Sequence, residues 1–299
     1  MSIDTSREWD SLWNYDQPAE SEQRFRALLP RVTDQGHRAE LKTQIARTFS
    51  LRLMFDQAHA ALDEVERELT DAMPVARVRY LLERGRAFNS AKLRDRARPL
   101  FLEAVDAANQ AKLDGYVVDA LHMLAIVEPE PAAQHEWNRR AMALAESSDD
   151  PPARRWLATL YNNIGWTYYD QKEYGAALDV FRKAIPLREQ AGKVIPLRIA
   201  HYAVGKTLRA MGKLDEALAI QQRLHAEHQA EKNPDGFVCE EIAECLLARG
   251  DADGSRPWFK LAADHLANVG WFVASEPARL ERFRALGSAA SSSDRASSS

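Results

Sequence analysis

Apolar and small side chains recur along most of this chain at spacings of three and four residues, the period of an amphipathic helix with one buried face. Two such stretches form a pair, and the pair repeats about every forty residues. A small residue in the first stretch is followed by a larger one in the second. These positions, sixteen residues apart, are Ala46 and Leu62, Gly85 and Phe101, Gly165 and Phe181, Gly205 and Gln221, and Ala243 and Phe259. The pattern predicts antiparallel helix pairs that approach closely at the small residue, with Gln221 as a polar exception.

A helix pair with one apolar face cannot bury that face alone, so the stacking of successive pairs must supply the core. Short polar or glycine-containing segments separate the two helices of a pair, as expected of tight turns. They are Asp170-Gln171-Lys172, Met211-Gly212-Lys213 and Arg249-Gly250-Asp251. A length of 299 residues ordinarily suggests two domains. An array grows by addition of repeats instead, so we expect one elongated domain.

One repeat departs from the period. Ala125 precedes Trp137 by only twelve positions, and Pro129 and Pro131 fall between them. If Leu121 takes the place of the small residue, the spacing of sixteen is restored. The sequence leaves both registers open for this repeat, which covers about residues 115–145.

The two ends of the array are predicted to differ from its middle. A degenerate opening unit has Trp9 and Trp13 before Phe25, which indicates a capping helix pair. Near the other end, Leu280 and Phe283 would cover the last repeat, while Arg279, Glu281, Arg282 and Arg284 face water. The predicted segments are a cap over residues 1–37, the repeat array over 38–270, a closing helix within 271–286 and a disordered Ser-rich tail over 287–299.

The repeat resembles a known family. The residues that carry the resemblance are Tyr161, Ile164, Gly165, Tyr168, Ala177 and Phe181. Their spacing is similar to that of the tetratricopeptide repeat (TPR), although the units here run to about forty residues rather than the usual thirty-four. The resemblance implies an all-α fold, a right-handed α-solenoid of about six stacked antiparallel helix pairs. It also implies a scaffold for protein–protein interaction, with a ligand bound in a concave groove.

Composition narrows the class of protein. The formal net charge of −4 gives no electrostatic reason to expect nucleic acid or an anionic membrane as a partner. No run of apolar residues approaches the roughly 18–20 that a membrane helix needs, and the first residues lack a signal-peptide core. Cys239 and Cys245 lie six apart on one predicted helix, where they point to different sides and cannot form a disulfide. We expect a cytoplasmic protein.

The candidate binding residues come from the TPR resemblance. In that family the first helix of each pair lines the groove, and a few recurring positions of that helix point inward. Carried onto this sequence, with Asn163 as a neighbour, these positions give Arg79, Arg86, His122, Asn162, Asn163, Trp166, Tyr169, Tyr202, Lys206 and Arg209.

Cations, aromatic rings and carboxamides alternate in this set. Arginine grips carboxylates in bidentate fashion, asparagine bonds to peptide groups, and the rings provide anchoring area. The C-terminal end of the groove is acidic, with Glu240, Glu241 and Glu244 expected to be exposed. The arrangement favours a protein or peptide partner, with an acidic or carboxylate-terminated segment near Lys206 and Arg209 as one option.

Two other classes of function stay open: a small-molecule or catalytic site among the aromatic and basic residues, and a structural subunit that self-associates. The sequence holds no glycine-rich phosphate loop and no nucleophile-elbow motif. Cys239 and Cys245 have no histidine at metal-binding spacing. We therefore predict no catalytic residue, no cofactor and no metal, and we favour a non-enzymatic scaffold.

Overall fold

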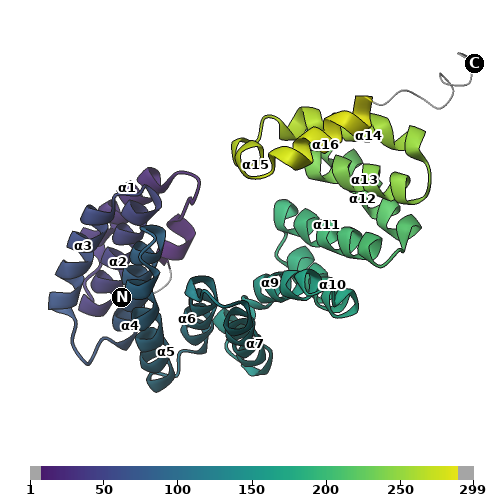
Figure 1. Ribbon diagram of the computed structural model, residues 1–299. Coiled ribbons are helices and arrows are strands. Elements are labelled where there is room, and N and C mark those ends of the chain that lie inside the picture. Colours follow the sequence, from purple (N-terminus) through teal and green to yellow (C-terminus); the bar gives the residue numbers. More distant parts are fainter. Residues whose placement is uncertain (1–7, 289–299) are drawn as a thin grey trace, which may run out of the picture. The chain divides into compact units, whose positions relative to one another are not determined.

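The computed structural model describes residues 8–288, and over this range the secondary structure is entirely helical (Figure 1). The helices are η1 (Glu8–Leu12), α1 (Pro18–Leu28), η2 (Leu29–Arg31), α2 (Gln35–Leu51), α3 (Phe55–Glu68), α4 (Pro74–Ser90), α5 (Arg94–Gln110), α6 (Asp114–Val127), α7 (Pro131–Ser147), α8 (Pro151–Arg154), α9 (Leu157–Asp170), α10 (Tyr174–Gln190), α11 (Val194–Ala210), α12 (Leu214–Ala230), α13 (Gly236–Ala248), α14 (Ala252–Leu266), α15 (Gly270–Ser275) and α16 (Pro277–Ser288). The all-α solenoid of helix pairs is thus confirmed.

The chain forms two compact units, Met1–Leu160 and Tyr161–Ser299, where the sequence led us to expect one domain. In a repeat array each helix pair is held only by its neighbours, so the array can divide wherever one junction is weaker. Each unit is described below by itself. None of the helices formed by residues 8–288 has the length and apolar character needed to cross a bilayer.

The spacing of sixteen residues marks the closest approach within a helix pair. A Cβ atom built on Gly165 would lie 2.4 Å from Cε1 of Phe181, and one on Gly85 would lie 2.5 Å from Cε1 of Phe101. Both distances are too short for any side chain, so glycine is required at each position. Gly205 meets the polar exception in the same way, since its Cβ would lie 2.6 Å from Nε2 of Gln221.

The irregular repeat adopts the register of Leu121. In the regular repeats the first helix ends five residues after its small residue, as α4 does after Gly85 and α11 after Gly205. Helix α6 ends at Val127, six residues after Leu121 and only two after Ala125. We therefore call Ala46, Gly85, Leu121, Gly165, Gly205 and Ala243 the packing residues of their helices.

The predicted turns carry left-handed backbone. Lys172, Gly212 and Gly250 have φ values of 63°, 76° and 85°, and each follows the first helix of its pair. Glycine takes this conformation without strain, whereas a lysine there pays a steric cost. The turn residues therefore end each first helix and reverse the chain.

Both ends differ from the predictions. The opening helix pair is a short 3-10 turn, η1, and a single helix, α1, which pack Trp9 and Phe25 against α2 in a buried cluster. At the other end, α15 was not expected, and α16 extends through Gly287 and Ser288, which were assigned to the tail. The rest of the predicted tail, from residue 289, lies outside the described residues.

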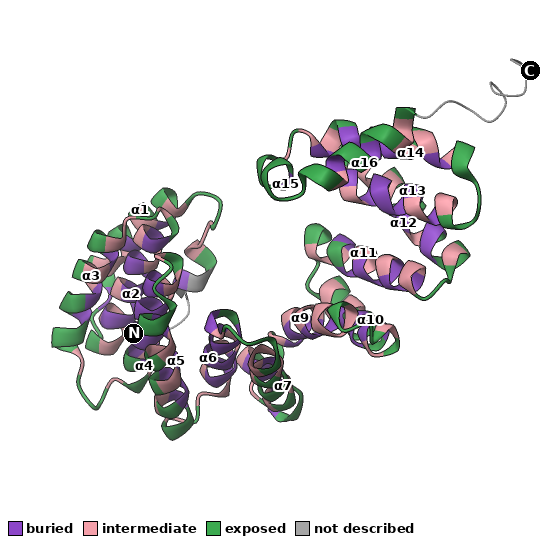
Figure 2. Ribbon diagram, in the orientation of Figure 1, coloured by how far each residue is buried: buried purple, intermediate pink, exposed green. Residues whose placement is uncertain are grey.

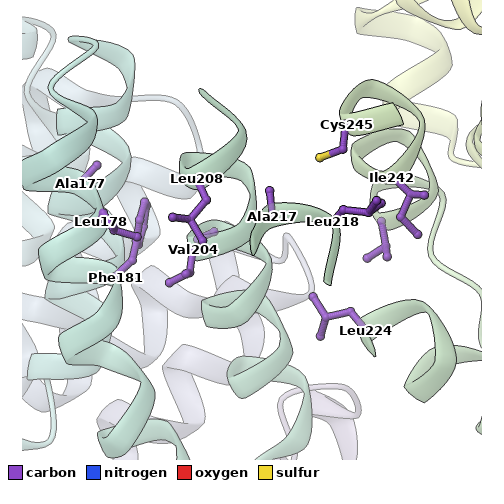
Figure 3. Close-up of a cluster of buried hydrophobic side chains, with 12 residues drawn as sticks. Ala177, Leu178, Phe181, Val204, Leu208, Ala217, Leu218, Leu224, Ile242 and Cys245 are labelled. Atoms are coloured by element: carbon purple, nitrogen blue, oxygen red, sulfur yellow. The ribbon is translucent and has the colours of Figure 1, made fainter. Parts of the chain in front are cut away.

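The second unit has two apolar clusters, separated by α13. One joins α10, α11 and α12 to one side of α13 and includes Phe181, Leu208 and Cys245 (Figure 3). The other joins the opposite side of α13 to α14, α15 and α16 and includes Cys239 and Phe283. The two cysteines are free and buried, on different sides of α13 as predicted. Burial raises the pKa of Cys239 to about 11 and that of Cys245 to about 12.

Candidate partner-binding surface

Each packing residue lies on the first helix of its pair. These first helices are α2, α4, α6, α9, α11 and α13, and ion pairs join several of them to the next first helix. In three of the repeats the residue after the packing residue pairs with the residue two before the packing residue of the next repeat. We call this the ion-pair row. Its pairs are Arg47–Glu83, Arg86–Asp119 and Lys206–Glu241, and it continues as Glu244–Arg282 onto α16.

In the first unit two partly buried arginines are held by carboxylates of this chain. Arg86 bonds to Glu83 on its own helix at 2.7 Å and to Asp119 on α6. Burial lowers the pKa of Arg86, but the two carboxylates more than offset it, so the net pKa is raised. Arg79 lies 3.2 Å from Oε2 of Glu40 and donates a 2.7 Å hydrogen bond to the hydroxyl of Tyr116. Both predicted arginines are thus bound to groups of this chain.

On α6, His122 occupies the position that Arg47 and Arg86 hold on α2 and α4. It follows the packing residue Leu121, and its ring lies 5.2 Å from that of Trp156 in a tilted arrangement. Burial lowers the pKa of His122, with a smaller lowering by Arg86 that the carboxylate of Asp119 opposes. The neutral form of the imidazole is therefore favoured more than in a free histidine side chain.

In the second unit two cations share one carboxylate. Lys206 and Arg209 on α11 each lie 2.6 Å from the Glu241 carboxylate, whose side chain is fully buried, while the cations are 17% and 24% exposed. Burial raises the pKa of Glu241, but the hydrogen bonds and charges of Arg209 and Lys206 outweigh it and hold the pKa below its usual range. One positive charge is left over around this carboxylate.

The glutamates expected to make the C-terminal end of the groove acidic mostly pair with cations of this chain. This finding corrects two expectations. Glu240 and Glu241 are buried rather than exposed. Glu240 accepts hydrogen bonds of 2.6–2.9 Å from Arg279 of α16, which was expected to face water. Burial raises the pKa of Glu240 despite this arginine. The sequence could not reveal these pairs because the partners lie in different repeats, 32 to 39 positions apart.

Three aromatic side chains lie beside the cations of the second unit. Trp166 and Tyr169 on α9 meet edge to face with ring centroids 5.4 Å apart, and Trp166 also contacts Phe181 at 5.1 Å. Tyr202 on α11 has the Lys206 ammonium 5.7 Å from its ring centroid. All three are partly buried against the apolar cluster of α10–α13. Figure 2 shows buried and partly buried positions along α9 and α11. Asn162 and Asn163 precede them, with Nδ2 of Asn162 3.5 Å from Oδ1 of Asn163.

The ion-pair row is interrupted at α9. The residue after its packing residue is Trp166 instead of a cation, and the matching position on α11, two before Gly205, is Ala203. No ion pair can form between an indole and a methyl group. At this step α9 presents partly exposed rings and carboxamides, whereas the step from α11 to α13 presents the ion pair of Lys206 and Glu241.

The ten predicted binding residues divide between the units. Arg79, Arg86 and His122 belong to the first, and the other seven belong to the second, where Tyr169 is close enough to Arg209 for the cation to affect the pKa of its phenol. Burial, the larger effect, raises that pKa. The residues that the prediction missed are the carboxylates Glu40, Glu83, Asp119 and Glu241. Three of them lie two residues before a packing residue, but this shared offset identifies a pair only once the rotation between repeats is known.

Comparison with known proteins agrees with this fold. Residues 157–191 match the family model for the tetratricopeptide repeat. The apo form of RapI is 12% identical with a TM-score of 0.68, over 93% of this chain and 83% of that one. The tetratricopeptide-repeat sensor protein PH0952 from Pyrococcus horikoshii, a signal transduction ATPase, is 14% identical with a TM-score of 0.69, over 89% of this chain and 42% of that one.

A third similar structure is a Rap protein complexed with competence and sporulation factor. It is 14% identical with a TM-score of 0.54, over 88% of this chain and 75% of that chain. No curated protein matches the sequence.

Proposed function

We propose that this chain, which is a tetratricopeptide-type repeat protein, is an interaction scaffold that binds a peptide or partner-protein segment in a groove formed by its first helices. One observation carries the proposal: the ion-pair row is interrupted at α9, where Trp166 takes the place of a cation and the ring of Tyr169 lies against it. Large partly exposed rings provide the kind of anchoring area that dominates protein interfaces. The peptide-bound Rap structure gives a precedent in the same fold.

The paired charges define the role of the remaining predicted residues. Arg79 and Arg86 are neutralised by carboxylates of this chain, so they position the first helices and present no free charge to a ligand. Lys206 and Arg209 share Glu241 and keep one positive charge in excess. We therefore centre the binding site on Asn162, Asn163, Trp166, Tyr169, Tyr202 and this cation pair.

The test is a pull-down from native lysate, read by mass spectrometry. The variant Trp166→Leu/Tyr169→Leu keeps apolar bulk against the helix core but removes both rings. Trp258→Leu is the matched control, because Trp258 is also partly buried against the same apolar cluster but lies on α14, a second helix. We expect at least one protein to be captured by wild type and the control and lost from the double variant.

Equal capture by all three folded proteins would remove the aromatic site from the interaction. Native mass spectrometry of the purified chain then separates the other two classes of function. A bound mass of a few hundred daltons would support a small-molecule site, and a doubled mass would support self-association.

A further inference from the structure

One face of α11 changes chemistry along its length. Ile195, Ile199, Tyr202, Lys206 and Arg209 follow one another at spacings of three and four residues, so their side chains share a face of the helix. Ile195 is 69% exposed and Ile199 is 49% exposed. The face therefore runs from exposed apolar side chains, through a tyrosine, to two cations.

Helix α13 also changes from an apolar side chain to charged side chains at the equivalent positions. Phe237 lies six residues before its packing residue, as Ile199 does on α11, and the carboxylates Glu241 and Glu244 follow. Helices α11 and α13 are in contact. Trp271 of α15 stacks on Phe237 with ring centroids 5.9 Å apart and an interplanar angle of 14°, and Trp271 is 61% exposed. We call Ile195, Ile199, Phe237 and Trp271 the apolar edge.

In the first unit, charged side chains occupy the position that is apolar in the second. The residues six before the packing residues of α2 and α4 are Glu40 and Arg79, which form a 3.2 Å ion pair. In the first unit, residues at this position therefore touch across neighbouring first helices, and we infer the same neighbourhood for the equivalent residues of the second unit. In the second unit the position is occupied by Ile199 and Phe237. Exposed apolar side chains that gather in one place mark a surface that another molecule covers.

The opposite edge of this face is cationic. Lys206 and Arg209 share the single carboxylate of Glu241, and both keep part of their surface exposed. A ligand carboxylate placed there would meet the positive charge that Glu241 does not neutralise, with a guanidinium able to hold it through two hydrogen bonds. An ammonium or guanidinium in the ligand would be repelled.

We propose that the second unit receives an amphipathic helical segment of a partner protein, with its apolar stripe on Ile195, Ile199, Phe237 and Trp271 and an acidic edge against Lys206 and Arg209. The inference rests on the proposed scaffold function and specifies its partner. It assigns recognition to an apolar edge that lies outside the predicted groove residues.

The separation of the two edges favours a helix over an extended strand. Ile199 and Lys206 are seven residues apart on α11, which is about 10 Å at a rise of about 1.5 Å per residue. A helix with its side chains is about 10–12 Å across, so one helix laid across α11 and α13 reaches both edges. A single strand points alternate side chains to opposite faces, so only half of its side chains would meet this surface.

Two synthetic sixteen-residue peptides test the proposal on the full chain by fluorescence anisotropy. Both carry leucines at helical spacing, and they differ only in whether glutamates or lysines flank the leucine stripe. We expect the glutamate peptide to bind at least tenfold more tightly than the lysine peptide, with affinity falling as salt is added. Equal binding, or tighter binding of the lysine peptide, would overturn the acidic edge.

Exposed residues provide a matched pair of variants. Ile199→Asp places a charge on the apolar edge, and Leu261→Asp places one on α14, where Leu261 is 36% exposed. We expect Ile199→Asp to weaken the glutamate peptide at least tenfold and Leu261→Asp to leave it within twofold, with unchanged circular dichroism for both. If both variants bind the glutamate peptide as tightly as wild type does, the apolar edge is not part of the site.

The lysate experiment separates this inference from the proposed function. One outcome supports the scaffold function but overturns this inference. In it, a captured protein is lost from Trp166→Leu/Tyr169→Leu, is still captured by Ile199→Asp, and is not displaced by the glutamate peptide. Absence of both lysate capture and peptide binding would overturn both. A dimer that Ile199→Asp dissociates would place a second copy of the chain on the apolar edge instead and also overturn the inference.

Discussion

At the scale of single residues, the close approach of helices depends on the absence of a side chain at Gly85, Gly165 and Gly205. A Cβ atom at Gly85 or Gly165 would lie within 2.5 Å of a ring carbon of Phe101 or Phe181, well inside van der Waals contact. Two well-packed helices cannot separate by the required distance without losing contacts along their whole length, because protein interiors are densely packed. The same spacing in the sequence predicted these contacts correctly.

We predict that Gly165→Leu lowers the free energy of unfolding by about 1–3 kcal/mol through overpacking against Phe181. Gly175, in α10, is the control, because a Cβ there would meet no atom within 4 Å. Gly175→Ala should raise stability by about 0.5–1 kcal/mol, since alanine favours helix more than glycine does. Urea unfolding followed by circular dichroism measures both, and an unchanged midpoint for Gly165→Leu would contradict the packing described here.

At the scale of helices, the ion-pair row couples α2 to α4, α4 to α6 and α11 to α13. Glu241 is its most enclosed carboxylate, because its fully buried side chain joins α13 to two cations of α11. Hydrogen bonds that involve charged groups contribute about 1.5–3 kcal/mol each, whereas exposed ion pairs contribute little. The row therefore fixes how successive repeats stack.

We predict that Glu241→Gln lowers the free energy of unfolding by about 1.5–3 kcal/mol near neutral pH. The pKa of Glu241 is lower in the folded state than in the unfolded chain, so its contribution is present above the unfolded pKa of about 4.3 and is lost as pH falls through the folded value. The difference between wild type and variant should therefore be constant above about pH 5 and shrink on acidification.

Thermal unfolding at pH values from 3 to 7 measures this difference. Glu216→Gln is the control, since Glu216 is exposed and its nearest cation, Lys213, is 4.0 Å away. A difference that grows toward low pH would contradict the assigned direction of the Glu241 pKa.

The helices and turns could be predicted from the sequence, whereas the ion-pair row could not. The helical period and the spacing of sixteen report contacts inside one repeat, which are local in sequence. The pairing of Arg209 with Glu241 depends on how repeats rotate against each other, and spacing alone does not determine that rotation. Trp166 and Tyr169, three residues apart on one helix, lie together as expected, whereas the expected exposure of Glu240 and Glu241 was wrong.

At the scale of the whole molecule, two compact units share one chain, and each has its own apolar clusters. In arrays of this kind stability is approximately a sum of repeat and nearest-neighbour terms, so damage to one end spreads only as far as neighbour coupling carries it. Phe283 is fully buried where α16 closes the second unit, and Phe25 is fully buried in the first.

We predict that Phe283→Ala costs about 3–5 kcal/mol and that the loss of hydrogen-exchange protection is confined to the second unit. Phe25→Ala is the reciprocal variant and should reduce protection in the first unit alone. Hydrogen exchange read by mass spectrometry of peptic fragments distinguishes the two. Parallel loss of protection in both units by either variant would mean that the chain unfolds as one cooperative body.

The ion-pair row also bears on how such a chain can grow by gene duplication. Helix α4 carries both halves of the row, Glu83 and Arg86, so a tandem copy of α4 and α5 would set the cation of one copy beside the carboxylate of the next. A tandem copy of α11 and α12 would set Lys206 against Ala203 and leave a cation without a counterion. Repeats of this protein are therefore not interchangeable modules, and lengthening of the array is expected to start from α4 and α5.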